Sequence, residues 1–166
     1  GKWLNFVNLH EIIDYCSDLD VSAATEEKKT RIGEISSSAV INMPQMALEA
    51  LSENWLFKEL GDIHWDKLCE GLGKSSFNLA DELGNRLYAT FVRIRIDCSG
   101  NLKSFKENKR MDINGSISRF GESMYFSKMK LESEGESIQA DLMTAFSIRN
   151  STDNTKLAKS QPASGE

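Results

Sequence analysis

Residues 52–71, with the sequence SENWLFKELGDIHWDKLCEG, constrain the fold more than any other stretch of the chain. Their number corresponds to about five turns of α-helix. Ser52 is suited to cap the first turn, because its hydroxyl can accept a hydrogen bond from an otherwise unpaired backbone amide. Gly71 can adopt the left-handed conformation that ends a helix. The sequence therefore predicts one long helix over residues 52–70.

The apolar side chains of this predicted helix form an unusually wide arc. At about 100° per residue, the arc contains Leu56, Phe57, Leu60, Ile63, His64 and Leu68, and Gly61 and Trp65 extend it. Such an arc indicates a helix that a sheet wraps in part. Gly61 costs about 1 kcal/mol relative to alanine, which predicts a close approach of helix and sheet at this point. We expect His64 to be largely buried, and its simplest interpretation is a packed histidine with a satisfied hydrogen bond.

The second half of the chain alternates apolar and polar residues with the period of β-strands. The predicted strands cover residues 86–98, 102–108, 110–118, 123–131 and 137–150. In the first of them, Tyr88, Val92 and Ile96 are expected on one face, and Leu87 and Phe91 on the other. One helix followed by antiparallel strands with short turns predicts an α+β fold, in which a curved antiparallel sheet wraps one central helix. This is the hot-dog architecture.

The remaining segments set the expected domain boundaries. Residues 1–41 are expected to form an N-terminal extension with a short helix near residues 8–17, and residues 42–150 the hot-dog domain. Residues 151–166 contain almost no apolar side chains, so we expect a disordered tail or a linker there. A single hot-dog sheet leaves an edge unpaired, which predicts a homodimer or pairing with a neighbouring hot-dog domain.

Composition excludes several classes of protein. The net charge of −5 argues against a general nucleic-acid binder. No apolar run reaches the roughly 18 residues that a membrane-spanning helix needs, and no signal-peptide pattern is present. The three cysteines are widely spaced and form no CxxC pair, so neither a metal site nor a disulfide framework is predicted. These features are typical of a cytoplasmic protein.

Five segments resemble a family of natural-product biosynthesis proteins related to the leinamycin-pathway bifunctional acyltransferase/decarboxylase. They are residues 43–46 (MPQM), 51–56 (LSENWL), 58–62 (KELGD), 64–65 (HW) and 85–91 (NRLYATF). The resemblance covers roughly residues 42–131. Those proteins resemble fused double hot-dogs of about twice this length, and this chain is similar to one unit, the C-terminal one. If the chemistry of the family resides in the other unit, this one is inactive.

The resemblance implies polyketide-type chemistry on acyl thioesters carried by coenzyme A or by the phosphopantetheine arm of an acyl carrier protein. It implies acyl transfer through a tyrosine and decarboxylation of a methylmalonyl group, with no bound cofactor. Tyr88 matches the position of that tyrosine. The alternative interpretation of Tyr88 is a core tyrosine with its hydroxyl at the rim.

The start of the predicted helix supplies further candidates. Its free amides, with Ser52 and the side-chain amide of Asn54, can polarise a thioester carbonyl. Glu53 can act as the base of a thioesterase, although capping and the helix dipole already explain Ser52 and Glu53. We expect Tyr88 to lie close to this helix start. His64 lies about three turns further along the helix, so it is expected to orient another group rather than touch the substrate.

Two other groups of residues are weaker candidates. Arg119, Phe120 and Gly121 stand at a strand–turn junction, where a plain β-turn is the favoured interpretation and substrate binding through Arg119 the alternative. The only local basic cluster contains Lys103, Lys106, Lys109 and Arg110. It is either a solvated surface or a surface that attracts an acidic carrier protein. Two classes of function remain open: an acyltransferase/decarboxylase, with thioesterase or dehydratase variants, and a non-catalytic unit that docks a carrier protein or completes a dimer.

Overall fold

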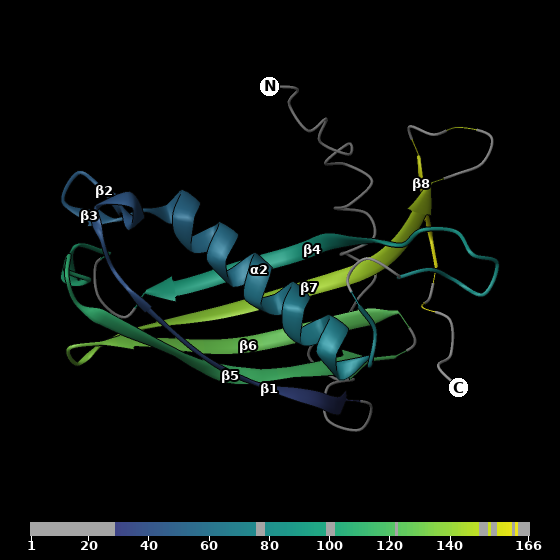
Figure 1. Cartoon of the computed structure of the whole chain (residues 1–166), viewed down its shortest axis with the longest axis horizontal. Coiled ribbons are helices and arrows are strands. Elements are labelled where there is room, and N and C mark those ends of the chain that lie inside the picture. The colour runs from purple at the N-terminus through teal and green to yellow at the C-terminus, as the bar shows by residue number, and fades with distance from the viewer. Residues whose placement is uncertain are drawn as a thin grey trace.

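The computed structural model describes residues 29–75, 79–98, 102–121, 123–149, 153, 156–160 and 162. One helix, α2 (Glu53–Gly71), crosses the concave face of an antiparallel sheet (Figure 1). The strands of the sheet are β1 (Lys29–Val40), β4 (Tyr88–Cys98), β5 (Arg110–Phe120), β6 (Met124–Ser133), β7 (Glu136–Arg149) and β8 (Leu157–Lys159). Short elements η1 (Met43–Gln45), β2 (Met46–Ala47), β3 (Ala50–Leu51) and η2 (Leu102–Ser104) complete the described part. The predicted α+β fold with one wrapped helix is confirmed.

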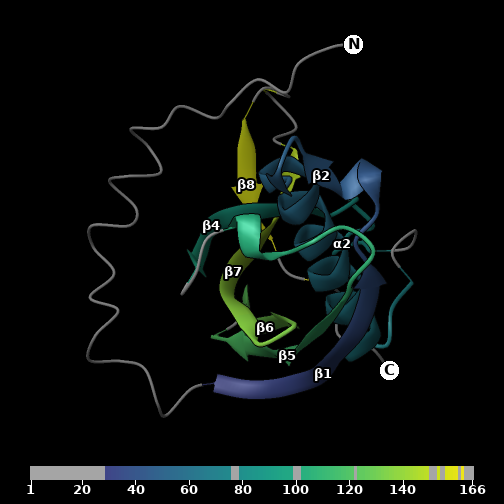
Figure 2. The same cartoon turned by 90° about the vertical axis from the view of Figure 1, so that its left-hand side faces the viewer.

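The sheet follows the order β1-β5-β6-β7-β4, and β8 pairs with β7. Viewed along the helix, the sheet curls around α2 (Figure 2). The core fills the space between them, because one face of each central strand is apolar. Met111, Ile113 and Ile117 of β5 are fully buried there, as are Leu131 of β6 and Leu142 of β7. The strands predicted over residues 110–118 and 137–150 correspond to β5 and β7.

The helix begins as predicted but ends differently. The Ser52 hydroxyl accepts a hydrogen bond from the backbone amide of Trp55, at 3.4 Å. Gly71, however, is still helical, and Gly73 takes the left-handed conformation with φ of 62°. The Gly73 amide donates to the carbonyl of Glu70 and the Lys74 amide to that of Cys69, both at 3.0 Å. These two bonds satisfy two of the carbonyls in the last turn of the helix.

Gly71 is needed for another reason, which is the close passage of β1. A Cβ atom at position 71 would lie only 2.9 Å from the carbonyl oxygen of Ile32. The predicted close approach at Gly61 is looser, because a Cβ there would meet the Phe91 ring at 3.4 Å, an ordinary contact. The buried stripe of α2 is also narrower than the predicted arc, since Phe57 is 42% exposed. The buried residues of the helix are Leu56, Leu60, His64, Leu68 and Cys69.

Strand β4 contains a bulge that the sequence pattern does not show. Phe91 pairs with Thr144, but Arg93 pairs with Met143, so Val92 is an extra residue in the ladder. An extra residue exchanges the two faces of a strand. Ile96 therefore packs against the core together with Ala89, seven positions earlier. The prediction that Tyr88 and Ile96 share one face was wrong for this reason.

Two predicted domain boundaries and one predicted strand need correction. Residues 29–40 are not part of an extension, because β1 pairs with β5 along its whole length. The tail contributes β8, which pairs with residues 147–149 of β7. Residues 102–108 do not form a strand: η2 turns there, and Phe105 is buried in the core. The short helix predicted near residues 8–17 lies outside the described residues.

Candidate functional site

A groove of about 410 Å³ lies between the middle of α2 and the start of β4, and we call it the α2–β4 groove. Its apolar lining comes from both elements: Phe57, Gly61 and Trp65 from the helix, Leu87, Ala89 and Phe91 from the strand and the residue before it. Its rim consists of the exposed residues Lys58, Asp62, Arg86 and Tyr88. Gly61 keeps the groove open, because it places no side chain between the helix and the Phe91 ring.

His64 also lines the α2–β4 groove, and it is completely buried. Its Nδ1 lies 2.5 Å from the Ser127 hydroxyl of β6, and its Nε2 lies 2.8 Å from the Thr144 hydroxyl of β7. The ring also contacts Phe91, with 5.8 Å between the centroids. Burial lowers the pKa of His64 to about 4, so the imidazole is neutral at pH 7. Both ring nitrogens are engaged by hydroxyl groups, which suits a role in positioning the helix.

The predicted site residues fall into three separate places. Tyr88 stands at the rim of the α2–β4 groove, beside the middle of the helix rather than at its start. Figure 1 shows that β4 runs toward the start of α2. It is therefore the Cys98 end of the strand, and not the Tyr88 end, that lies near Glu53. Burial raises the pKa of the Cys98 thiol, and the charges of Asp97 and Glu53 add to this effect. The expected meeting of Tyr88 with the helix start does not occur.

Arg119 and Phe120 end β5, and Gly121 takes the left-handed conformation with φ of 61° in the turn that follows. These three residues do not line the α2–β4 groove. Arg119 pairs with Tyr125 across the ladder. Burial raises the pKa of Tyr125, and the charge of Arg119 opposes this shift. The roles predicted for Arg119, Phe120 and Gly121 therefore concern a different part of the sheet from the role predicted for Tyr88.

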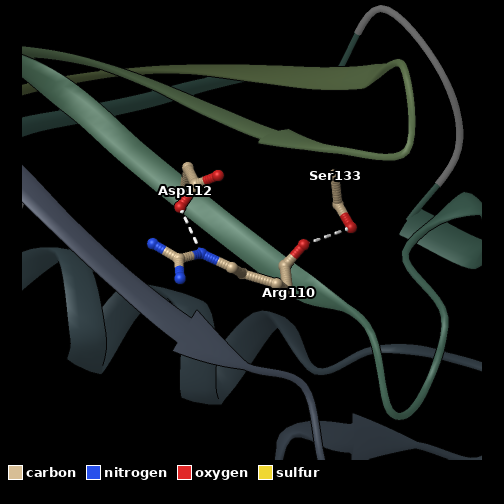
Figure 3. A network of polar contacts seen from close by, with 3 residues as sticks. All are labelled: Arg110, Asp112 and Ser133. Atoms are coloured by element: carbon tan, nitrogen blue, oxygen red, sulfur yellow. Dashed lines mark hydrogen bonds and ion pairs between the residues drawn. The ribbon is translucent and has the colours of Figure 1, made fainter.

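Carboxylates accompany most of the predicted basic cluster. Arg110 donates from Nε to Asp112 at 2.8 Å, and the Ser133 hydroxyl donates to the Arg110 carbonyl at the same distance (Figure 3). Lys109 lies 2.6 Å from Glu134, and Lys103 lies 3.7 Å from Glu49. These ion pairs reduce the net positive charge of the cluster, so it attracts an acidic partner less strongly than its sequence suggests.

Sequence reasoning missed the α2–β4 groove itself. Arg86, Leu87, Ala89 and Phe91 looked like ordinary residues of the strand predicted over residues 86–98. The only feature of the sequence that pointed to the groove was Gly61, a glycine in the interior of a predicted helix. Among the described residues, no group of His, Cys, Asp or Glu side chains is arranged to hold a metal ion. In the same part of the chain, no helix is both long and apolar enough to cross a membrane.

The comparisons with known proteins identify the fold. No protein-family model matches the chain, and no curated protein matches its sequence. Among solved structures, the 4-hydroxybenzoyl-CoA thioesterase of Pseudomonas sp. strain CBS-3 matches with a TM-score of 0.60 at 8% identity, over 80% of this chain and 94% of that one. The 1,4-dihydroxy-2-naphthoyl-CoA thioesterase of Synechocystis matches with a TM-score of 0.59 at 10% identity, over 76% and 89%.

A third match is a hypothetical thioesterase of Streptococcus pneumoniae solved with coenzyme A. Its TM-score is 0.52 at 11% identity, over 72% of this chain and 89% of that one. At such identities the likeness concerns the fold alone. The chain therefore has a hot-dog fold, as its element order predicted, and its structural neighbours are thioesterases of that fold.

Proposed function

We propose that this chain is an acyl-thioester-processing hot-dog domain that binds its ligand in the α2–β4 groove. The observation that carries the proposal is the groove itself: apolar walls suited to an acyl chain or a pantetheine arm, with the exposed phenol of Tyr88 at the rim. Thioesterases acting on coenzyme A esters share the fold, which supports the same class of ligand here.

The reaction we propose is acyl transfer with decarboxylation, of the type used in polyketide biosynthesis in the cytoplasm. The Tyr88 oxygen attacks the thioester carbonyl, the C–S bond breaks, the phenol proton passes to the leaving thiolate of coenzyme A or of a carrier protein, and an acyl ester forms on Tyr88. In the decarboxylation, the bond between the α-carbon and the carboxylate breaks, carbon dioxide leaves, and the electron pair left on the α-carbon takes up a proton from water. The family resemblance around residues 85–91 supports this role. Asn54 and Glu53 stand apart from Tyr88, so their proposed catalytic roles require a ligand that extends along the helix to its start.

The second candidate is a non-catalytic unit that completes a dimer or docks a carrier protein. It is favoured by β4, whose outer edge no strand of the described chain covers. Tyr88, Phe91 and Ile94 of this strand are exposed, and Phe57 of α2 is exposed beside the groove. Large apolar side chains along a free edge are typical of pairing surfaces. We propose that β4 pairs with a second copy or with a neighbouring hot-dog domain.

The two candidates are separated by incubating the protein with methylmalonyl-, malonyl- and acyl-loaded carrier proteins and the corresponding coenzyme A esters. Intact mass spectrometry then follows the ligand and the protein. Loss of carbon dioxide from the ligand shows decarboxylation, and gain of an acyl group by the protein shows transfer. Release of free acid shows a thioesterase. Binding without any mass change supports the non-catalytic unit that docks a carrier protein. The absence of both binding and mass change contradicts catalysis and carrier docking, and it leaves only the unit that completes a dimer.

A further inference from the structure

Two arginines lie over the ring of Tyr88, which stands at the rim of the α2–β4 groove; Arg86 also lines the groove, and Arg149 does not. The guanidinium carbon of Arg86 lies 5.7 Å from the centroid of the Tyr88 ring, and that of Arg149 lies 5.6 Å from it. Tyr88 pairs with Ser147 in the antiparallel ladder of β4 and β7. Arg86 precedes Tyr88 by two residues and Arg149 follows Ser147 by two, so both extend beyond the same end of the ladder. The fold therefore gathers two positive charges around one phenol.

Both arginines are exposed, and neither forms an ion pair within the described part of the chain. Arg31, Arg95 and Arg110 behave differently, since each pairs with a nearby carboxylate. Like charges on adjacent strands destabilise a sheet, and the face of a tyrosine ring compensates only part of that cost. The chain carries a net charge of −5, so two unpaired arginines at one place do not follow from a basic composition.

We propose that Arg86 and Arg149 form an oxyanion-binding site at the rim of the α2–β4 groove, which holds an anionic group of the thioester ligand. A guanidinium presents parallel N–H donors that match the two oxygens of a carboxylate or a phosphate. Two anions belong to such ligands: a carboxylate at the far end of the acyl group, and the phosphate of the carrier arm. The inference rests on the proposed function, because it assumes that the groove binds a thioester.

Binding measurements with non-reactive thioether ligands test this site. The first ligand is a pantetheine thioether with an uncharged alkyl group, the second is the same pantetheine ending in a carboxylate, and the third is the coenzyme A thioether with the uncharged alkyl group. Each is titrated calorimetrically into the wild type, Arg86→Gln, Arg149→Gln and Arg93→Gln. Arg93 is the matched control, because it is an exposed arginine of β4 that neither lines the groove nor lies over the Tyr88 ring.

We expect Arg86→Gln and Arg149→Gln to weaken the binding of an anionic ligand by about tenfold or more, since each removes a charge-assisted hydrogen bond. The uncharged pantetheine should bind all four proteins equally, and Arg93→Gln should resemble the wild type. Arg86→Lys, which keeps the charge without the paired donors, should recover part of the loss. Weakened binding confined to the carboxylate ligand identifies the acyl group as the source of the anion. Weakened binding confined to the coenzyme A ligand identifies the phosphate.

Equal binding of both anionic ligands to the wild type and the two variants would overturn the oxyanion site and leave the proposed function intact, provided that the uncharged ligand still binds. An equal loss in Arg93→Gln would also overturn it, because the effect would then come from general charge. If no ligand binds the wild-type protein, both the oxyanion site and the proposed function fail.

Discussion

Nε2 of His64 lies 2.8 Å from the Thr144 hydroxyl, so the middle of α2 is tied directly to β7. The opposite ring nitrogen lies 2.5 Å from the Ser127 hydroxyl and ties the helix to β6. A neutral imidazole offers one donor and one acceptor, so one hydroxyl accepts from the ring and the other donates to it. This buried bridge fixes the height of the helix above the sheet at the point where the α2–β4 groove opens.

The first prediction concerns the pH dependence of stability. His64 has a pKa of about 4 in the folded protein, against 6.5 for an ordinary histidine. Between these values the unfolded chain binds a proton that the folded chain does not, so the free energy of unfolding falls as the pH falls from 6.5 toward 4. Above pH 6.5 the contribution is fully present, and its total is on the order of 3 kcal/mol.

Urea unfolding of the wild type and His64→Gln across this pH range measures the effect. The variant should lose the part of the pH dependence that histidine contributes, while the carboxylates contribute equally to both proteins. Parallel curves between pH 6.5 and 4 would show that His64 does not titrate as described.

The second prediction is that Thr144→Val destabilises the fold by about 1–3 kcal/mol. The change keeps the shape of the side chain but leaves Nε2 of His64 buried without its partner. Thr90→Val is the matched control, because Thr90 is only half-buried on β4. Chemical denaturation of both variants provides the comparison, and similar losses for the two would mean that the hydrogen bond to His64 contributes nothing specific.

The third prediction concerns Tyr88. Tyr88→Phe removes one oxygen from a side chain that is 37% exposed, so folding should be preserved. Acyl transfer should fall by roughly several orders of magnitude if the phenol is the nucleophile. Tyr125→Phe is the control, because the Tyr125 hydroxyl has no hydrogen-bond partner among the described residues. A Tyr88→Phe protein that forms the acyl adduct at the wild-type rate would remove Tyr88 from the reaction.

The fourth prediction distinguishes two effects of substitutions at Gly61, one on the stability of the helix and one on ligand binding in the groove. Alanine fits there with an ordinary contact to Phe91, so Gly61→Ala should raise the free energy of unfolding by up to about 1 kcal/mol. Gly61→Leu should fill the groove and abolish binding of an acyl thioether. Thermal unfolding and calorimetric titration check the two effects. Undiminished binding by Gly61→Leu would place the ligand elsewhere.

The sequence predicted the parts of the fold that repeat regularly. The helix over residues 52–70, its cap at Ser52 and the burial of His64 follow from local chemistry and from 3.6-residue periodicity. The strands near residues 110–118, 123–131 and 137–150 follow from alternation. Together they were sufficient to predict the hot-dog architecture, because a helix with a wide apolar arc and a run of antiparallel strands have few other ways to bury their apolar faces.

The errors arose where tertiary contacts decide. The alternation of apolar and polar residues gives no sign of the bulge at Val92, so it placed Ile96 on the wrong face of β4. Gly71 looked like the residue that ends the helix. Glycine is needed there because a Cβ atom would clash with the carbonyl oxygen of Ile32, which lies far away in the sequence. The candidate site was predicted only in part: Tyr88 was chosen, whereas Arg86 and Arg149 become neighbours only through the pairing of β4 with β7.

The position of β4 makes two kinds of binding interdependent. The strand is at once a wall of the α2–β4 groove and one of the uncovered edges of the described sheet. A chain that pairs with this edge would hold Phe91 and Tyr88 in fewer conformations, and a ligand in the groove would do the same from the other side. Thermodynamic linkage then requires reciprocity: a partner that changes the affinity for the ligand by some factor has its own affinity changed by the same factor.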